Sequence, residues 1–279
     1  MTVPLDVAWE LVVVDNNSTD ETKAVCESFQ QRSGRQFQYL FEPRQGKSFA
    51  LNRAVEQSQG EILAFTDDDI WVDPNWLVEI LQTFDRFQCA GLGGRVVPVW
   101  SSKPPKWYVS EGPYSIGGAI PCYDFGDEFM PVKATPFGAN VSVLGSMFRK
   151  YGGFRNDLGL FGGIRIGGED TEFCRRLMNA GELVMYAPTA VVFHPVLEAQ
   201  TKKSYCQEWH YALGKSIVRR EGIPENALRI FGVPGYMIRL FLQNCLTWLL
   251  NFRPEKRFYY KLKTCQILGE ISESRRPAQ

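Results

Sequence analysis

Acidic residues gather at three places in this chain of 279 residues, and their types and spacing suggest one shared site. Asp15 ends one apolar run, three consecutive aspartates at 67–69 end another, and Glu169 and Asp170 follow a glycine-rich stretch. Like charges that converge in one cleft repel each other unless a cation or a proton lies among them. Carboxylates spaced as D-x-D can offer oxygens to one hard divalent ion, which also binds phosphates. The three clusters therefore indicate a site for a metal ion and a nucleotide.

Each acidic cluster also has a purely structural explanation. An aspartate after a strand can simply start a turn. Three consecutive aspartates can form a solvated loop with a helix cap at its far end, and Asp170 can cap its own helix. His194 is one of only two histidines and follows an apolar run, where a structural histidine is more common than a ligand. The residue types alone leave both explanations open.

The elements that must position these clusters alternate between strand and helix. Apolar runs predict strands at 11–14, 37–41, 62–65, 184–186 and 191–193. Periodicity and capping signals predict helices at 19–31, 48–58, 74–84 and 171–180, and the chain is largely helical from about 201 onward. This order predicts an α/β fold with a mixed, mostly parallel sheet flanked by helices. Ligands of such sheets bind beyond the carboxyl ends of the strands, which is where the aspartates fall.

Composition excludes several classes of protein. The 31 basic and 31 acidic residues cancel, so a general nucleic-acid binder is not indicated. The balance is uneven, because residues 1–199 carry a net charge of −8 and residues 200–279 one of +8. Seven scattered cysteines without a C-x-x-C pair argue against a zinc site or a disulfide framework, and favour reduced thiols in the cytoplasm.

Six segments, in this order, carry a resemblance to a known family. They are Val12–Asp20 (VVVDNNSTD), Arg44–Ala54 (RQGKSFALNRA), Phe65–Asp69 (FTDDD), Phe137–Asn140 (FGAN), Gly168–Leu177 (GEDTEFCRRL) and Val192–His194 (VFH). Together they resemble family 2 glycosyltransferases with the GT-A fold, over roughly residues 9–200. The resemblance implies an inverting transfer of a sugar from a nucleoside diphosphate, usually UDP, to a hydroxyl of a glycan, lipid or other acceptor.

The resemblance also implies a role for each matching residue. The nucleotide side would comprise Asp15, Asn17, Arg44, Lys47, Asp67 and Asp68. The ligands of Mn²⁺ or Mg²⁺ would be Asp69, Asp67 and His194. Asp170 would be the general base, with Glu169 beside it. The sugar and acceptor side would be lined by Gly138, Ala139 and Asn140.

One departure from the family pattern concerns the start of the chain. Family members normally begin with a further strand and helix ahead of the Val-Asp strand. We therefore expect residues 1–200 to form an N-terminally truncated GT-A domain, and residues 201–279 to form a helical, basic extension. The alternative to an enzyme is a relic of the same fold that binds nucleotide or glycan without turnover.

The extension carries an apolar segment, Met237–Leu250, which is shorter than the roughly 20 residues that a membrane span needs. Polar residues at 239, 243 and 247 form a narrow stripe, and basic residues follow. This pattern predicts an amphipathic helix on an anionic membrane surface, and a helix packed on the catalytic domain is the alternative. We therefore expect a cytoplasmic protein, peripheral on the inner face of the membrane, whose acceptor is a glycan or is lipid-linked.

Overall fold

The computed structural model describes residues 7–33, 37–161 and 164–276. The chain divides into two compact units. The first contains Met1–Val97, Tyr123–Gly163 and Gly168–His194, and the second contains Pro98–Cys122, Ile164–Gly167 and Pro195–Gln279. The long loop that follows residue 97 thus belongs with the C-terminal helices, and His194 is the last residue of the first unit.

The first unit begins with a parallel strand pair. Strand β1 (Leu11–Asp15) pairs with β2 (Phe37–Phe41), so that Asp15 lies opposite Phe41. Helix α1 (Thr22–Ser33) connects them, as a parallel pair requires. The helix begins at Thr22 rather than near residue 19, because Asp20 Oδ1 accepts the Thr22 N–H at 3.0 Å. Helix α2 (Lys47–Gln57) follows β2.

The larger sheet has the strand order β3-β7-β5-β10-β4, with β6 also paired to β10. These strands are β3 (Ile62–Phe65), β4 (Trp71–Val72), β5 (Gly91–Trp100), β6 (Met130–Pro131), β7 (Val141–Leu144) and β10 (Val184–Val196). β10 joins the two short strands expected at 184–186 and 191–193 into one. The pairs β3–β7, β5–β7, β4–β10 and β6–β10 are antiparallel. With the parallel pair β1–β2, the strand pairing of the first unit is mixed, as expected. The four pairs of the larger sheet named here are antiparallel, so the expectation of mostly parallel pairing was wrong for them. Parallel neighbours need crossover helices, and β7 arrives from a long irregular segment.

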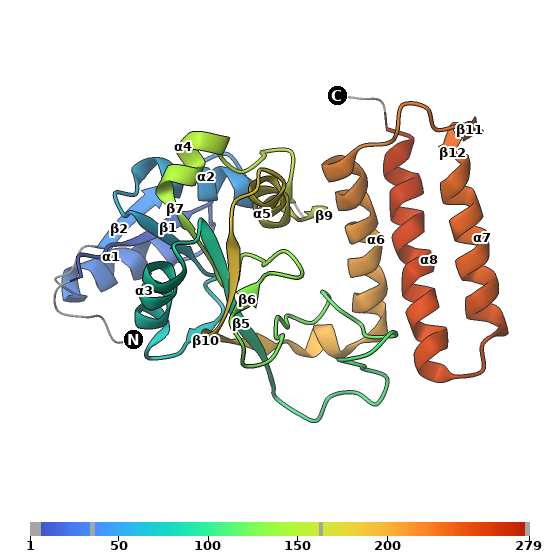
Figure 1. The fold of residues 1–279 in the computed structure, drawn as a ribbon, viewed down its shortest axis with the longest axis horizontal. Helices are drawn as coiled ribbons and strands as arrows, with labels where there is room; N and C mark the ends of the chain where they lie inside the picture. The colour runs from blue at the N-terminus through green and yellow to red at the C-terminus, as the bar shows by residue number, and fades with distance from the viewer. Residues whose placement is uncertain (1–6, 34–36, 162–163, 277–279) are drawn as a thin grey trace. The chain divides into compact units, whose positions relative to one another are not determined.

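Three helices flank this sheet in the first unit (Figure 1): α3 (Trp76–Phe87), α4 (Gly145–Tyr151) and α5 (Glu169–Asn179). Helix α3 begins two residues later than the Asp-Pro pair suggested, because the Asp73 side chain accepts the Asn75 N–H at 2.9 Å. The core between helices and sheet is mainly apolar, and Leu92, Leu177 and Tyr186 in it have no exposed surface. Short strands β8 (Gly159–Phe161) and β9 (Ile164–Ile166) precede α5.

The second unit is a helical bundle. Its long helices are α6 (Lys203–Glu221), α7 (Gly235–Leu250) and α8 (Pro254–Ser274), with α8 lying between the other two (Figure 1). A short 3-10 helix (Glu198–Thr201) and a hairpin of β11 (Arg229–Ile230) and β12 (Val233–Pro234) complete it. Helices α6 and α8 approach closely at two glycines. A Cβ at Gly214 would lie 1.9 Å from the Gln266 oxygen, and one at Gly269 would lie 1.9 Å from the Tyr211 oxygen. Among the described residues, no helix is both long enough and apolar enough to cross a bilayer.

Candidate active site

Asp15 lies at the carboxyl end of β1, where its side chain is buried. Its two oxygens accept the Ser18 N–H at 2.8 Å and the Tyr39 hydroxyl at 2.7 Å. Burial alone would raise the pKa of Asp15, but these hydrogen bonds outweigh it and lower the pKa. Burial and the same carboxylate raise the pKa of Tyr39 to about 12. The strand end therefore holds an ionised carboxylate in a fixed position.

Asn16, which the sequence analysis did not single out, connects this strand end to the start of α2. Its Nδ2 donates to the Arg44 carbonyl at 2.7 Å, and its Oδ1 accepts the Gly46 N–H at 2.7 Å. Asn17, which the sequence analysis did select, is exposed and has a left-handed backbone with φ of 62°. The left-handed position turns the chain back after the strand, so that Asn16 can hold the segment before Lys47.

Lys47 is the first residue of α2, and it connects two of the acidic clusters. Its Nζ donates to Asp67 Oδ1 at 2.6 Å. Glycine at 138 lies directly beside it, since a Cβ there would be 3.2 Å from Lys47 Nζ and 3.4 Å from Asp170 Oδ2. Burial opposes the positive charge, but Asp67, Glu169 and Asp170 together raise the pKa of Lys47 above its ordinary value. Lys47 is therefore a permanent cation among carboxylates.

The metal ligands expected from the resemblance are grouped on the same side of this lysine. Asp67, Asp69 and His194 each offer one ligand atom, and these atoms all lie within 4.8 Å of one another. His194 is 9% exposed, and its Nε2 is 3.8 Å from Asp69 Oδ1. The two carboxylates suit Mn²⁺ or Mg²⁺, and the imidazole is a ligand typical of transition metals, which favours Mn²⁺ of the two. These residues therefore fit the ion that the resemblance implies.

Asp170 and Glu169 begin helix α5 and lie near the same lysine. The Gly138 N–H donates to Asp170 Oδ2 at 2.6 Å, and the Thr171 N–H donates to Oδ1 at 2.6 Å. Asp170 is half-buried, whereas Glu169 is only 3% exposed. Burial, and then the charge of Asp170, raise the pKa of Glu169 above its ordinary value. Of the two carboxylates, Asp170 is the more accessible.

Gly138, Ala139 and Asn140 do not contribute in the same way. Gly138 contacts the cluster through its backbone, and Ala139 is buried at 1% exposure. The Asn140 side chain is in the core: its amide nitrogen donates to the carbonyls of Arg95 (3.0 Å) and Ala190 (2.8 Å), and its oxygen accepts the Trp76 indole N–H (2.9 Å). Its amide therefore supports the loop that carries Gly138, and is not available to a bound sugar.

Arg44 lies apart from the lysine cluster, in an ion pair with a buried glutamate that the sequence analysis did not identify. Its guanidinium donates to both oxygens of Glu42, at 2.7 and 2.9 Å. The Arg44 hydrogen bonds hold the pKa of Glu42 at about 2, even though burial opposes them. The signal for this pair in the sequence was only the i, i+2 spacing of opposite charges.

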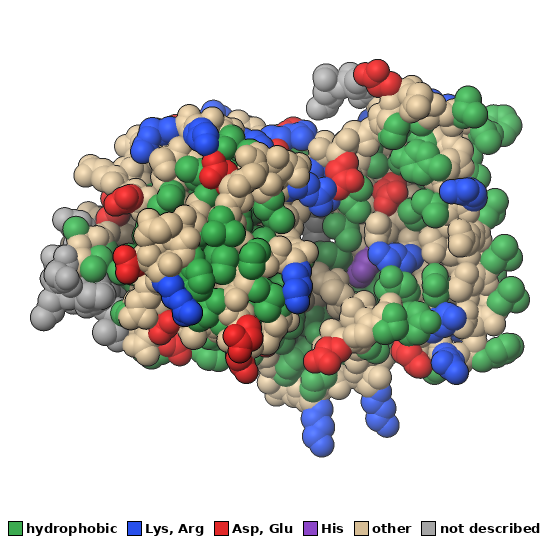
Figure 2. Space-filling view, viewed as in Figure 1, with side chains coloured by type: hydrophobic (Ala, Val, Ile, Leu, Met, Phe, Trp, Pro, Cys, Tyr) green, Lys and Arg blue, Asp and Glu red, His purple; other side chains and the backbone are tan. Residues whose placement is uncertain are grey.

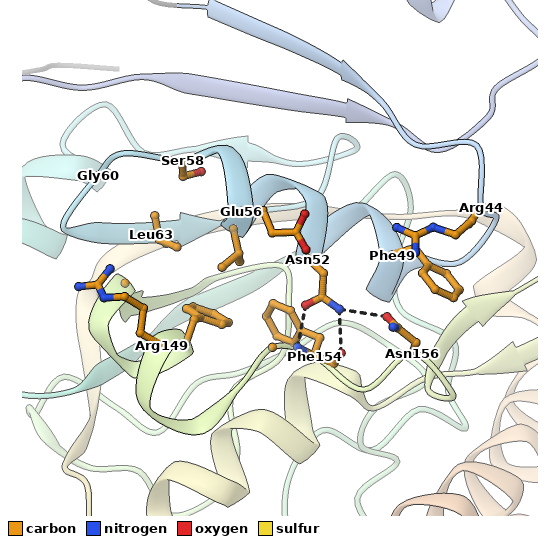
Figure 3. A pocket seen from close by; sticks show the side chains of 14 residues that line it. Arg44, Phe49, Asn52, Glu56, Ser58, Gly60, Leu63, Arg149, Phe154 and Asn156 are labelled. Carbon is orange, nitrogen blue, oxygen red and sulfur yellow. Dashed lines mark hydrogen bonds between the residues drawn. The ribbon is translucent and has the colours of Figure 1, made fainter.

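Arg44 also lines a cavity of about 620 Å³ (Figure 3). The cavity runs between α2 and the segment after α4. Arg44 and Arg149 lie toward its two ends, and Asn52 between them donates to the Phe154 carbonyl (2.8 Å) and Asn156 Oδ1 (3.0 Å). None of its lining residues belongs to the lysine–aspartate cluster. The cavity is thus a separate feature of the first unit.

The structure thus brings seven of the selected residues into one cluster: Lys47, Asp67, Asp69, Gly138, Glu169, Asp170 and His194. Asp15 is connected to it through Asn16 and the turn before α2. Asp68, between the two ligand aspartates, is exposed. Residues from β3, the start of α2, the start of α5 and the end of β10 therefore converge, although they are far apart in the chain.

The sequence matches the family model described as Glycosyl transferase family 2 over residues 6–140. The chain is 27% identical over 197 residues to the glucosyl-dolichyl phosphate glucuronosyltransferase of Haloferax volcanii, covering 69% of this chain and 61% of that protein. It is 26% identical over 223 residues to the succinoglycan biosynthesis protein ExoM of Rhizobium meliloti, covering 77% and 66%. The chain therefore spans less than two thirds of the length of these relatives.

Among solved structures, the fold is similar to the mannosyltransferase PcManGT from Pyrobaculum calidifontis in complex with GDP-Man and Mn²⁺. The TM-score is 0.59 at 15% identity, covering 95% of this chain and 77% of that one. A second similar structure is GalNAc-T7 with UDP, GalNAc and Mn²⁺, with a TM-score of 0.52 at 14% identity, covering 77% and 45%. These likenesses confirm the GT-A fold, and the sequence match places residues 6–140 of the chain in glycosyltransferase family 2.

Proposed function

We propose that the protein transfers a sugar from a nucleoside diphosphate donor to a hydroxyl of an acceptor, with inversion at the anomeric carbon. The observation that carries this proposal is the convergence of the Asp67–Asp69–His194 group, Lys47 and Asp170. Solvated acidic loops without a function would have no reason to share one lysine. A cation and a metal-binding group, together with a further carboxylate at Asp170, match the two charges that such a reaction develops.

The leaving group of the reaction is a nucleoside diphosphate, whose negative charge grows as the sugar departs. Asp67, Asp69 and His194 would hold a divalent ion, which would supply positive charge to stabilise the leaving group. Lys47 adds a second, permanent positive charge from the chain itself. Asp15 sits at the neighbouring strand end, where its fixed carboxylate can accept hydrogen bonds from the base of the nucleotide.

The acceptor hydroxyl must lose a proton as it attacks the anomeric carbon. We assign this proton to Asp170, the more accessible of the two carboxylates at the start of α5. The Gly138 N–H orients Asp170 by donating to one oxygen, and a carboxylate oxygen keeps a further lone pair for the incoming hydroxyl. A single base opposite the leaving group gives inversion, whereas a double displacement would need a second carboxylate near the anomeric carbon.

For the donor we propose a UDP-sugar, and for the acceptor a glycan or a lipid-linked sugar of polysaccharide biosynthesis. Support comes from the relatives, since one is named as acting on a glucosyl-dolichyl phosphate and another as a succinoglycan biosynthesis protein. One structural neighbour contains UDP with Mn²⁺, and another contains GDP-Man with Mn²⁺. The reaction would take place on the cytoplasmic side of the membrane, at its inner face. No nucleic acid is involved.

Binding and turnover test this proposal separately. Calorimetry with UDP and GDP, each with and without Mn²⁺, should show binding that depends on the ion and is lost in Asp69→Asn. The matched control is Asp85→Asn, an exposed aspartate on α3, which should bind like the parent. A panel of nucleotide sugars is then assayed for donor hydrolysis and transfer. Ion-dependent binding without any turnover would favour the non-catalytic relic, and binding that ignores Asp69 would contradict the metal site.

A further inference from the structure

Helix α7 exposes leucines where a helix in a bundle normally exposes polar residues. Leu242, Leu246, Leu249 and Leu250 have exposed fractions of 54%, 58%, 60% and 71%. An amphipathic helix of a soluble bundle turns its apolar side inward. The inner side of α7 is already apolar and occupied, since Met237 is buried at 2% exposure and Lys261 of α8 lies over the Trp248 ring at 5.5 Å. The leucines are therefore in excess of what packing on α8 requires.

The exposed apolar surface continues beyond both ends of the helix. Phe252 follows α7 and is 96% exposed, while Leu228 (87%) and Phe231 (96%) lie at the hairpin before it. We call the four leucines and these three residues the apolar edge. Figure 2 shows hydrophobic side chains projecting along the side of the bundle where α7 runs in Figure 1. A continuous surface of this kind marks a site of contact with another apolar phase.

The charges around the apolar edge are mainly basic, and Glu255 in the first turn of α8 is the acidic exception within it. Residues 226–254 contain three arginines and no Asp or Glu. Two of them, Arg239 and Arg253, are exposed within α7 and just after it. Lys256 and Arg257 follow in the first turn of α8. A surface that combines leucine and phenylalanine with an excess of basic over acidic residues suits lipid acyl chains next to phosphate groups.

A second copy of this chain is a poorer occupant. In a symmetric dimer the same surface faces itself, so its excess of basic residues would meet an equal excess on the other copy, with few carboxylates to pair with. We propose that α7 lies flat on an anionic bilayer, with the apolar edge in the interface and the arginines at the phosphates. At 16 residues the helix extends about 24 Å along that surface. This contact requires neither nucleotide nor sugar, so it stands independently of the proposed reaction.

The test is co-sedimentation of the full chain with vesicles. We expect binding to vesicles that contain phosphatidylglycerol, weaker binding as salt rises, and little binding to pure phosphatidylcholine. The double variant Leu246→Gln, Leu249→Gln should lose at least tenfold in partitioning to anionic vesicles. The variant Arg239→Gln, Arg253→Gln should lose most of its preference for anionic over neutral vesicles. The control Leu183→Gln, the same change at a 40% exposed leucine in the first unit, should bind like the parent.

Circular dichroism and thermal unfolding establish that each variant is folded. If the glutamine variant fails to fold, two other variants still decide the question. The double variant Leu246→Phe, Leu249→Phe should keep its vesicle binding, and the double variant Arg239→Gln, Arg253→Gln should lose its preference for anionic vesicles. Vesicle binding by a folded glutamine variant at the parent level would overturn the proposal. A second outcome would also overturn it: the parent forms a dimer in sedimentation velocity, the glutamine changes dissociate that dimer, and the parent has no affinity for anionic vesicles.

Discussion

The change Asp170→Asn tests the assignment of the base with almost no change in side-chain size. Both Asp170 oxygens accept backbone N–H groups at 2.6 Å, from Gly138 and Thr171. An asparagine has one acceptor oxygen, so one of these N–H groups would face another donor and lose its partner. We expect a loss of stability of about 1–3 kcal/mol from that unpaired group. Removal of a general base should lower kcat by roughly 10²–10⁴-fold, which is a barrier increase of about 3–5 kcal/mol.

The two effects are separated by measuring them on the same samples. Thermal unfolding gives the stability of Asp170→Asn, and donor transfer at a temperature well below its midpoint gives kcat. Calorimetry should show that binding of UDP with Mn²⁺ is preserved, because Asp170 is not one of the three grouped metal ligands. The comparison variants are Glu169→Gln and Asp85→Asn. If the folded Asp170→Asn protein retained more than a tenth of the parent kcat, or Glu169→Gln alone abolished turnover, Asp170 would not be the base.

Three further changes test other parts of the structure. Because Arg44 holds the pKa of Glu42 at about 2, below the ordinary 4.5, Glu42 adds stability that is present above pH 4.5 and lost as the pH falls toward 2. Urea unfolding measures the free energy of unfolding across that pH range. Between pH 4.5 and 2 the parent should lose about 2–3 kcal/mol more of it than Glu42→Gln does, a figure that already allows for solvent screening at the exposed Arg44. Burial and a neighbouring carboxylate raise the pKa of Glu169, so parent stability should fall as the pH rises from 4.5 toward the raised value, and Glu169→Gln should remove that slope. Gly269→Ala should destabilise the helical bundle by about 1–3 kcal/mol or more in thermal unfolding, whereas Gly117→Ala, with no atom within 4 Å of the added Cβ, should not.

The sequence was sufficient to predict the first strands, and to predict that the acidic residues lie at the carboxyl ends of strands. Apolar runs that end in aspartate predicted β1 and β3, and the structure has them at Leu11–Asp15 and Ile62–Phe65. These predictions depend on local pattern and on the general rule for strand ends, so they need no knowledge of distant contacts. The GT-A fold was inferred from six short segments in order, and the structural likenesses confirm it.

Partners far apart in the chain could not be predicted in this way. The Ser48 hydroxyl donates to the Leu158 carbonyl, 110 residues away, and Asn16 binds a turn 30 residues later. Helices α1 and α3 begin two or three residues later than predicted. In each case an aspartate side chain, Asp20 or Asp73, accepts a backbone N–H near the start of the helix. The antiparallel pairs of β7 depend on where a long irregular segment returns to the sheet, which periodicity does not encode.

The Asn140 amide has a consequence for how this position can vary. Its two donors and its acceptor are all engaged, and Gly94 lies so close that a Cβ there would be 2.2 Å from the amide nitrogen. Aspartate has the same shape but no donors, and glutamine has the same groups but one more methylene than the space allows. No other natural side chain reproduces this set, so we expect every replacement of Asn140 to leave a buried polar group without its partner and to destabilise the first unit. Replacements here are a rational route to temperature-sensitive alleles, in which the protein works at low temperature and fails on warming.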